Sequence, residues 1–474
     1  MLAYVATKRG KLVEIICSDG QSITTNSWSD LVTYLLKPTD MGVVWNIDQF
    51  AEVVCSLGIP HGLDAFDDKG RFFLPDGTKL YYQSNRVFGV TYGRQEVNFY
   101  GLQKYSDTEI TDAIELLFLG VKVLHAYREL GIDVRRLSSP VACFPLEDVP
   151  YPRACDLPDT AFDLLEATIP TMSREWRDVY KLGHWNADEV SDYDIHSAYP
   201  SIMAGLPDIS RAKYFTATEI PKHFSWGEMT GKLKITKPIS PFIHEPTESY
   251  PTGEWTDSIT TDQLWLLRRW GIGEFQMEKG HFLILPEKTT LPFKQTMESL
   301  YQARDTENPI AARIAKAISV GIGGKLAQRF EKGKLGADFN SIYARMVTSR
   351  CMVKVADFIY RNCMEKSVVS VMVDGCLSEK RIELPNQKVM GTWRRNPDSP
   401  FLVASMLYQW GSDKHPDGRY YSEVVEDMRK RPRMSFYGDI DLNLMDSTRN
   451  FAKRPRTGKD LLENKYCSEP IAVV

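Results

Sequence analysis

One stretch near the middle of the chain constrains its fold more than any other: residues 192–202, which read DYDIHSAYPSI. Asp194 ends a strand flanked by apolar residues, and a turn and a helix-like run follow at once. A carboxylate in such a place can help to hold a metal-bound phosphate. Many proteins also place an aspartate at an ordinary strand end, so the stretch by itself leaves both interpretations open.

Two helical patterns further along are joined by a very short connection. The first covers residues 291–305, and the second begins at Asn308-Pro309 and keeps apolar residues at helical spacing. Only a tight turn fits between them, so we expect two antiparallel helices, the second ending at the glycines of 321–324. Arg304 then lies near the tip of the first helix, and Lys316 lies about two turns into the second. A solvated helix face is the ordinary alternative for both cations.

An Asp-Gly pair stands between two apolar runs in residues 367–378, which read SVVSVMVDGCLS. Asp-Gly between such runs is the strongest short-range signal for a β-hairpin, and it places Asp374 in the turn. In isolation this aspartate need do no more than permit the turn.

Taken in chain order, the three segments resemble the motifs of family B DNA polymerases, in particular the short protein-primed viral branch. The first segment is similar to the first palm motif, whose aspartate binds two metal ions and whose turn and tyrosine hold the incoming nucleotide. By that resemblance Asp194 is a metal ligand, and Ser197 and Tyr199 bind nucleotide. Asp374 is similar to the second aspartate of the family's Asp-Thr-Asp-Ser hairpin, its main metal ligand.

The resemblance implies nucleotidyl transfer with two Mg²⁺ ions, or Mn²⁺ in their place. This chemistry depends on positioning and charge neutralisation, and two ions about 4 Å apart stabilise both the attacking and the leaving oxygen. Mg²⁺ prefers a few carboxylates together with phosphate oxygens of the substrate. We therefore expect Asp194 and Asp374 to be the catalytic, metal-binding residues.

Other positions depart from the family's pattern. Lys316 matches the lysine of the fingers motif, but residues 320–324 stand where the family has Asn-Ser-Leu-Tyr-Gly, and Met372 replaces the first hairpin aspartate. Arg304 and Lys316 remain as the predicted nucleotide-binding cations, because a planar guanidinium and a compact ammonium both suit phosphates.

Contacts with nucleic acid are expected mainly from the C-terminal part, although the net charge is only −4. Neutralisation of phosphates supplies much of the affinity for DNA. The predicted nucleic-acid-binding residues are Lys325, Tyr408, Arg429, Lys430, Arg431, Lys453 and Arg454. The basic clusters among them are equally compatible with an exposed tail that aids solubility. Trp393 and Trp410, in segments similar to later family strands, are expected to pack.

The N-terminal part forms a separate α/β unit that ends in a proline-rich stretch. Apolar runs at 12–17, 42–45 and 87–92 and a helix around 110–130 predict a ribonuclease-H-like sheet with flanking helices. Family B enzymes carry a proofreading 3′-5′ exonuclease at this place. Its Asp-x-Glu pair is missing here, and Asp48 and Asp112, which loosely match later motifs, also suit cap or turn roles. We expect this domain not to cut.

The expected fold class is α/β (α+β): a right-hand polymerase with an RRM-like palm, two-helix fingers and a short thumb, preceded by the ribonuclease-H-like domain. The expected boundaries are 1–150 for that domain, 151–288 and 331–420 for the palm, 289–330 for the fingers and 421–474 for the thumb. At 474 residues and 43% hydrophobic, the chain suffices for two or three cored domains.

The expected function is DNA-templated addition of dNTPs to a primer 3′-hydroxyl, without proofreading. Primer-template DNA, dNTPs and a priming or replication protein are the expected partners. The eight cysteines show no metal-ligand spacing, and no membrane-spanning run is visible, so we expect reduced thiols and no membrane in a cytoplasm, that of a host if the chain is viral. Two alternatives stay open: a catalytically silent nucleic-acid-binding protein of polymerase-like fold, and a working N-terminal nuclease.

Overall fold

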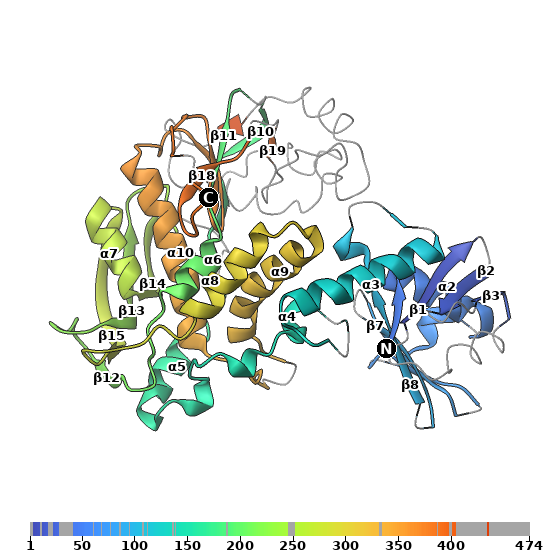
Figure 1. Ribbon diagram of the computed structural model, residues 1–474. Helices are drawn as coiled ribbons and strands as arrows, with labels where there is room; N and C mark the ends of the chain where they lie inside the picture. The colour runs from blue at the N-terminus through green and yellow to red at the C-terminus, as the bar shows by residue number, and fades with distance from the viewer. Residues whose placement is uncertain are drawn as a thin grey trace. The chain divides into compact units, whose positions relative to one another are not determined.

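The computed structural model describes residues 3–403 and 434–435, except for gaps at 10–11, 18–21, 28–40, 245–251, 331–333 and 398–400 and at single or paired loop positions. The chain is a mixed α/β protein, which confirms the expected class at that level (Figure 1). It divides into two compact units, residues 1–148 with 298–322 and residues 149–297 with 323–474. The finer division into five parts stays a prediction.

The main helices of the described chain are α2 (Ile47–Gly58), α3 (Ala113–Glu129), α4 (Pro140–Cys143), α5 (Phe162–Thr168), α6 (Ala198–Ala204), α7 (Thr261–Trp270), α8 (Lys294–Gln302), α9 (Pro309–Leu326) and α10 (Ser341–Arg361). The strands are β1 (Ala3–Arg9), β2 (Leu12–Cys17), β3 (Ser22–Thr25), β4 (Met41–Val44), β5 (Arg71–Phe73), β6 (Lys79–Gln83), β7 (Val87–Tyr92), β8 (Gln95–Gly101), β9 (Arg177–Val179), β10 (Lys181–Trp185), β11 (Ser191–Ile195), β12 (Lys213–Ala217), β13 (Trp226–Ile235), β14 (Gly253–Thr260), β15 (Gly273–Ile284), β16 (Val368–Met372), β17 (Gly375–Ser378), β18 (Trp393–Arg395), β19 (Phe401–Val403) and β20 (Met434–Ser435).

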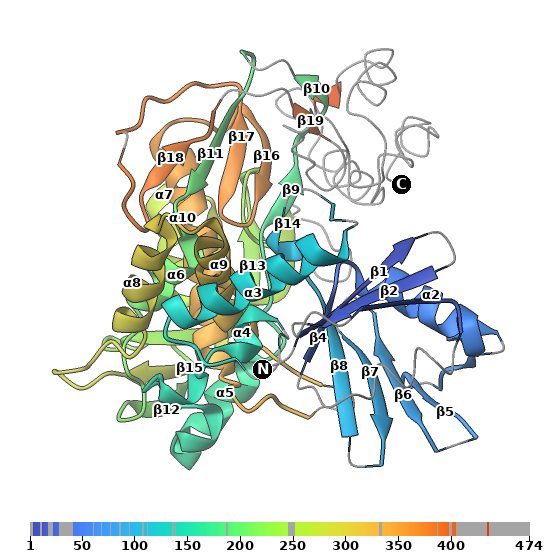
Figure 2. The same cartoon turned by 45° about the vertical axis from the view of Figure 1, so that its right-hand side comes forward.

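The first unit is built on an eight-stranded sheet in the order β3-β2-β1-β4-β8-β7-β6-β5 (Figure 2). Strand β4 runs parallel to both β1 and β8, and the other neighbours are antiparallel. Val44 joins the core that α2 fills, whereas Val43 lies beneath Gly120 of α3. Because neighbouring strand residues point to opposite faces, the two helices cover opposite sides of this sheet.

The predicted helix pair is present as α8 and α9, joined through a short 3₁₀ turn. One detail of the prediction was wrong: α9 does not end at its glycines but continues through Gly321, Gly323 and Gly324 to Leu326. Packing explains the first of them, because a β-carbon at Gly321 would lie 2.8 Å from the Val141 β-carbon in α4. This close helix contact outweighs the low helix propensity of glycine.

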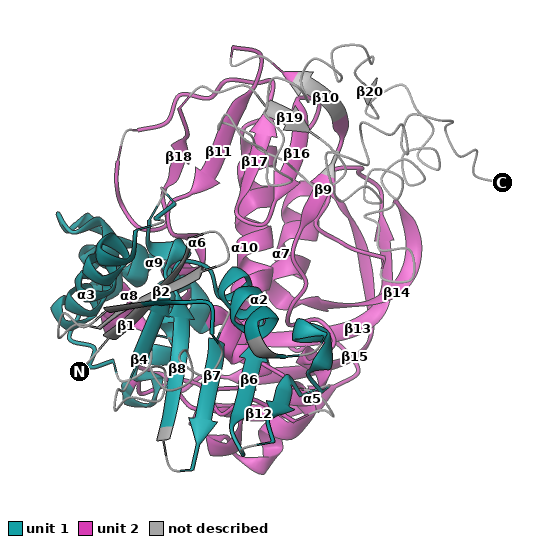
Figure 3. Cartoon of the chain, turned by 90° about the vertical axis from the view of Figure 1, so that its right-hand side faces the viewer, with its two compact units in different colours: residues 1–148, 298–322 teal, residues 149–297, 323–474 magenta. Residues whose placement is uncertain are grey.

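The second unit contains a five-stranded antiparallel sheet in the order β18-β11-β17-β16-β9, which Figure 3 shows side by side. The long helix α10 is almost entirely buried in this unit and contacts α5, α6 and α7. A second antiparallel sheet, β12-β15-β13-β14, lies in the chain between α6 and α8. A three-stranded sheet, β19-β10-β20, completes the described part of the unit.

A polar stripe along α10 is turned into the protein. Ser341, Arg345 and Ser349 stand at helical spacing on one face, and each is 0% exposed. Arg345 donates to a carboxylate oxygen of Glu228 in β13 at 3.2 Å and to Gln263 at the start of α7 at 2.8 Å. The buried charge is therefore paired, and it fixes α10 against α7 and the second sheet.

Candidate active site

The predicted aspartates meet at one end of the five-stranded sheet of the second unit. In the β11–β17 ladder Asp194 faces Gly375, the residue after Asp374, and the Ile195 amide donates to the Asp374 carbonyl at 2.9 Å. The aspartates are 180 positions apart in the sequence, and the strand register alone makes them neighbours. The sequence interpretation thus placed both residues on the correct elements, a strand end and a hairpin turn.

The backbone on both sides of this site adopts an uncommon conformation. Ser197, which precedes α6, has a φ of 53°, and Val373 in the hairpin turn has a φ of 50°. A β-branched residue at positive φ is a genuine outlier that costs about 1–3 kcal/mol. The Val373 amide donates to the Trp176 carbonyl at 2.8 Å, which helps to hold the turn. Such strain, retained beside two carboxylates, favours a functional interpretation of the turn.

The Asp374 side chain is half-buried and lies among negative charges. Burial raises its pKa to about 6, and the neighbouring Asp194, Asp192 and Glu175 carboxylates add to the rise. Burial likewise raises the pKa of the Cys351 thiol, which lies near Asp374 and Glu175. The negative charges around Asp374 therefore favour a cation at this site.

Arg394 supplies one such cation. It faces Asp194 in the β11–β18 ladder, and its Nε and Nη2 atoms donate to the two carboxylate oxygens at 2.5 and 2.7 Å. This is the paired fork geometry that makes Arg–carboxylate bonds strong. Beside it the Asn396 side chain donates to Asp192 at 2.7 Å. Sequence reasoning assigned no role to Arg394.

Glu175 is a second residue that sequence reasoning missed. It stands just before β9. Its carboxylate accepts a hydrogen bond from the Tyr199 hydroxyl at 2.8 Å and forms an ion pair with Arg177 at 2.6 Å. Burial, followed by the Glu175 charge, raises the pKa of Tyr199. The predicted nucleotide-binding tyrosine is thus held beside the acidic cluster, and the sequence around Glu175 carries no signal for it.

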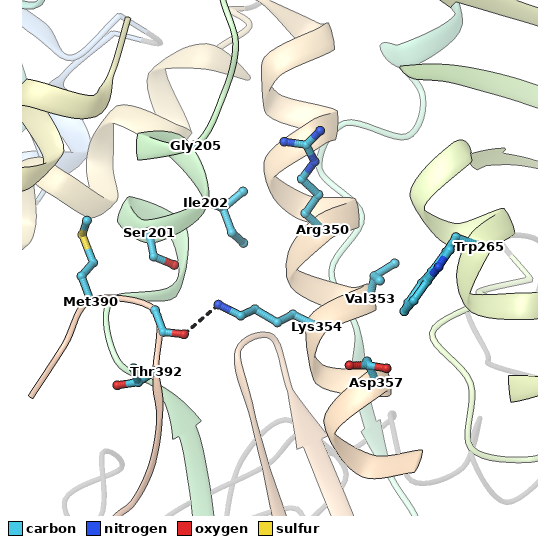
Figure 4. Close-up of a pocket in the computed structure, with 11 residues that line it drawn as sticks. Ser201, Ile202, Gly205, Trp265, Arg350, Val353, Lys354, Asp357, Met390 and Thr392 are labelled. Atoms are coloured by element: carbon cyan, nitrogen blue, oxygen red, sulfur yellow. Dashed lines mark hydrogen bonds between the residues drawn. The ribbon is translucent and has the colours of Figure 1, made fainter. Parts of the chain in front are cut away.

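A pocket of about 570 Å³ lies in the same unit between α6, α7 and α10 (Figure 4). Its wall includes Lys354, which donates to the Gly391 carbonyl at 2.7 Å, and burial lowers the pKa of this lysine. Gly391 needs to be a glycine, because its φ is 86° and a β-carbon would lie 2.9 Å from the Ser201 side chain. The segment before β18 is thereby fixed against α6 and α10.

Trp393, the first residue of β18, packs as predicted. Its ring stacks on Phe358 of α10 with the ring centroids 3.9 Å apart. Asn396 and His196 donate backbone hydrogen bonds to Asp192 and Thr392, and together with the Trp393 stack these bonds hold β18 beside β11.

The donor set fits a divalent cation in chemistry, although it is small. Within the described residues, no group of three or more His, Cys, Asp or Glu side chains is arranged to hold a metal. Two carboxylates are nevertheless enough for Mg²⁺ when substrate phosphates supply the other oxygens. The negative charges of Asp194, Asp192 and Glu175 near Asp374 favour an added positive charge there.

The other predicted site residues belong to other segments of the chain. Arg304 and Lys316 belong to the first unit, where Arg304 lies over the Tyr301 ring and Lys316 is exposed, so their role toward a nucleotide stays a prediction. Lys325, in the second unit, donates to Gln328 at 3.1 Å. The remaining residues predicted to bind nucleic acid, and Trp410, lie outside the described residues; these are Tyr408, Arg429, Lys430, Arg431, Lys453 and Arg454.

The two acids of the first unit that loosely match nuclease motifs have structural partners. Asp48 accepts hydrogen bonds from the Tyr82 hydroxyl at 2.8 Å and from Ser84 at 3.2 Å. Asp112 caps α3 by accepting from the amides of Ile114 and Glu115. The contacts of Asp112 agree with a cap role, whereas Asp48 lies within α2 and bonds to side chains near β6.

The cysteines with described side chains are free thiols; these are Cys55, Cys143, Cys155, Cys351, Cys363 and Cys376. No helix in the described ranges combines the length and the apolar character that crossing a membrane requires.

Comparison with known proteins relates this chain to one group of solved structures. No protein-family model and no curated protein matches the sequence. Phi29 DNA polymerase matches in structure: its complex with primer-template DNA gives a TM-score of 0.58 at 12% identity, and its ternary complex with primer-template DNA and incoming nucleotide gives 0.57 at 10%. Both alignments cover 85% of this chain and 84% of the other. At such identity the likeness shows a shared fold.

Proposed function

We propose that the chain is a DNA-templated DNA polymerase of the family B type that adds dNTPs to a primer 3′-hydroxyl. The observation that carries the proposal is the meeting of Asp194 and Asp374 across β11 and β17, in a fold similar to that of Phi29 DNA polymerase. Two acids at neighbouring strand ends are what two-metal nucleotidyl transfer requires.

In this proposal Asp194 and Asp374 hold two Mg²⁺ ions, or Mn²⁺ in their place. The ions would supply charge neutralisation at the attacking 3′-hydroxyl and at the leaving pyrophosphate. The chain's own residues position the reactants. Tyr199, bonded to Glu175, and the turn at Ser197 border the place of the nucleotide.

The proposal extends to the subdomains. The five-stranded sheet with α10 would form the palm, α8 and α9 the fingers with Arg304 and Lys316 on the triphosphate, and the C-terminal basic clusters a short thumb on the primer-template duplex. Residues 1–148 of the first unit would be the ribonuclease-H-like domain without nuclease activity. The strand order β3-β2-β1-β4-β8, with β1 and β4 parallel, and the structural partners of Asp48 and Asp112 support this assignment.

Two observations favour a second candidate, a silent polymerase-like nucleic-acid-binding protein. Arg394 already occupies the Asp194 carboxylate, and the fingers run lacks the family's Asn-Ser-Leu-Tyr. A scaffold of this kind would bind DNA with no need for a metal ion.

Primer extension separates the two candidates. A labelled primer-template is incubated with dNTPs and Mg²⁺, and DNA binding is followed in parallel by fluorescence anisotropy. The polymerase proposal expects extension that both Asp194→Asn and Asp374→Asn reduce at least about 100-fold, since each removes a metal-binding charge. Asp159→Asn, an exposed aspartate of the same unit, is the matched control. DNA binding without any extension by the unaltered protein would favour the silent scaffold.

A further inference from the structure

We propose that Arg394 is an internal counter-ion that competes with divalent metal ions for the Asp194 carboxylate. The inference deepens the proposed function, because it rests on Asp194 as a metal ligand. It assigns to Arg394 a role in setting how tightly the site binds its ions, and it predicts that metal binding displaces the guanidinium.

The first step is the geometry of the ion pair. The Nε and Nη2 atoms of Arg394 reach different oxygens of Asp194, at 2.5 and 2.7 Å, so both oxygens are engaged. A divalent ion on the same carboxylate would stand within a few ångströms of the guanidinium charge and be repelled by it. The ion and Arg394 therefore stabilise the same carboxylate in competition.

The second step is that the protein backbone sets up this pair. Residue 394 faces residue 194 in the β11–β18 ladder, and the ladder continues in backbone bonds from His196 to Thr392 and from Gly391 to His196. Lys354 ties down the same segment through the Gly391 carbonyl. The pairing of Arg394 with Asp194 thus follows from strand register and does not depend on a chance rotamer of a long surface side chain.

The third step is the difference between the two aspartates. Arg394 neutralises Asp194, while no ion pair joins Asp374 to a cation among the described side chains. The Arg394 side chain is 47% exposed, so it can leave for solvent without moving β18. A metal ion that enters beside Asp374 gains its second ligand only by exchanging with Arg394.

The strand also provides a matched control. Arg395 follows Arg394 in β18 and faces Tyr193, and adjacent strand residues point to opposite faces of the sheet. Arg394→Gln and Arg395→Gln change the net charge equally. Only the first removes the competitor of the metal.

The experiment measures Mn²⁺ binding to the metal-free full chain, with free Mn²⁺ followed by electron paramagnetic resonance and no DNA or nucleotide present. We expect Arg394→Gln to bind Mn²⁺ roughly tenfold tighter than the unaltered protein, because a charge-assisted, bidentate competitor is lost. Arg395→Gln should bind as the unaltered protein does. Arg394→Lys keeps the charge but loses the bidentate fork, so its Mn²⁺ affinity should lie between those of the unaltered protein and Arg394→Gln. This variant also provides the test if Arg394→Gln fails to fold.

The outcomes separate this inference from the proposed function. Unchanged or weaker Mn²⁺ binding in Arg394→Gln, with Asp194→Asn still abolishing it, overturns the counter-ion role and leaves the metal site standing. Equal tightening in Arg395→Gln also overturns it, because net charge would then explain the effect. If Asp194→Asn binds Mn²⁺ as tightly as the unaltered protein, Asp194 is not a metal ligand, and both the proposed metal site and the role of Arg394 are wrong.

Discussion

Gly375 stands directly opposite Asp194, so close to β11 that a β-carbon on it would come within 2.5 Å of the Tyr193 carbonyl oxygen and 3.2 Å of the Asp194 β-carbon. The φ of Gly375 is not positive, so close approach, and not backbone conformation, makes glycine necessary here. The Asp-Gly pair thus does more than permit a turn: its glycine lets the two catalytic candidates come together.

Gly375→Ala should therefore separate β17 from β11. We expect a loss of about 1–3 kcal/mol in the free energy of unfolding, from overpacking, and at least a tenfold drop in primer extension. Gly324→Ala, in α9, is the control, because a β-carbon there meets nothing within 4 Å and should be neutral or stabilising by up to about 1 kcal/mol. Urea unfolding and extension assays check both. Full activity in Gly375→Ala would show that the close approach is unimportant.

The raised pKa of Asp374 predicts a pH-dependent stability of the metal-free protein. The folded pKa is about 6, above the ordinary value of 3.8, so the fold favours the protonated carboxyl. Ionising this carboxyl in the folded protein lowers the free energy of unfolding. The loss is absent below about pH 4, grows as pH rises toward 6, and reaches about 3 kcal/mol at most. Asp374→Asn should therefore gain stability over the unaltered protein between pH 4 and 7 in EDTA.

The measurement for this prediction is urea unfolding at several pH values. Asp159→Asn should show a difference from the unaltered protein that does not vary with pH. A flat difference for Asp374→Asn would mean that the carboxyl is not destabilised in the fold.

The buried pair of Arg345 and Glu228 predicts a large loss on removing one partner. Both side chains are essentially inaccessible, and Glu228 also accepts from Thr171 at 3.0 Å. Glu228→Gln leaves a buried guanidinium without its counter-charge, which should cost about 3–5 kcal/mol. The double variant Glu228→Leu with Arg345→Met should recover much of that loss. Thermal unfolding checks this, and a single variant as stable as the unaltered protein contradicts it.

The cap of α3 predicts how the N-terminal acids behave. Asp112→Ala should lower the free energy of unfolding by about 1 kcal/mol, whereas Asp112→Asn, which keeps a capping oxygen, should lower it little. Neither change should alter the digestion of a labelled single strand, since we expect no 3′-5′ nuclease activity. Digestion by the unaltered protein that Asp112→Asn abolishes would establish a working nuclease in this unit.

Local signals in the sequence predicted the elements that carry the site. An aspartate before a turn and helix indicated the end of β11, and Asp-Gly indicated the β16–β17 hairpin, because both signals lie within a few neighbouring residues. Arg394 and Glu175 could not be found in this way. Arg394 lies 200 positions from Asp194, and only the register of β18 brings them together.

Packing between distant segments also decides features that local patterns in the sequence do not. The glycines of α9 indicate a helix end by propensity, but Gly321 fits against Val141 and the helix continues. The polar stripe at Ser341, Arg345 and Ser349 has the spacing of a solvated helix face. It is buried because Glu228 and Gln263, far away in the sequence, supply its partners.

Templated synthesis is tested most directly by incorporation of a single nucleotide on primer-templates that differ in one templating base, with Mg²⁺ and each dNTP supplied separately. We expect the unaltered protein to add the complementary dNTP in each case, and Asp194→Asn and Asp374→Asn to bind the same DNA but add no nucleotide. Addition of dNTPs regardless of the templating base would contradict templated synthesis. Addition that persists in both variants would contradict a site between Asp194 and Asp374.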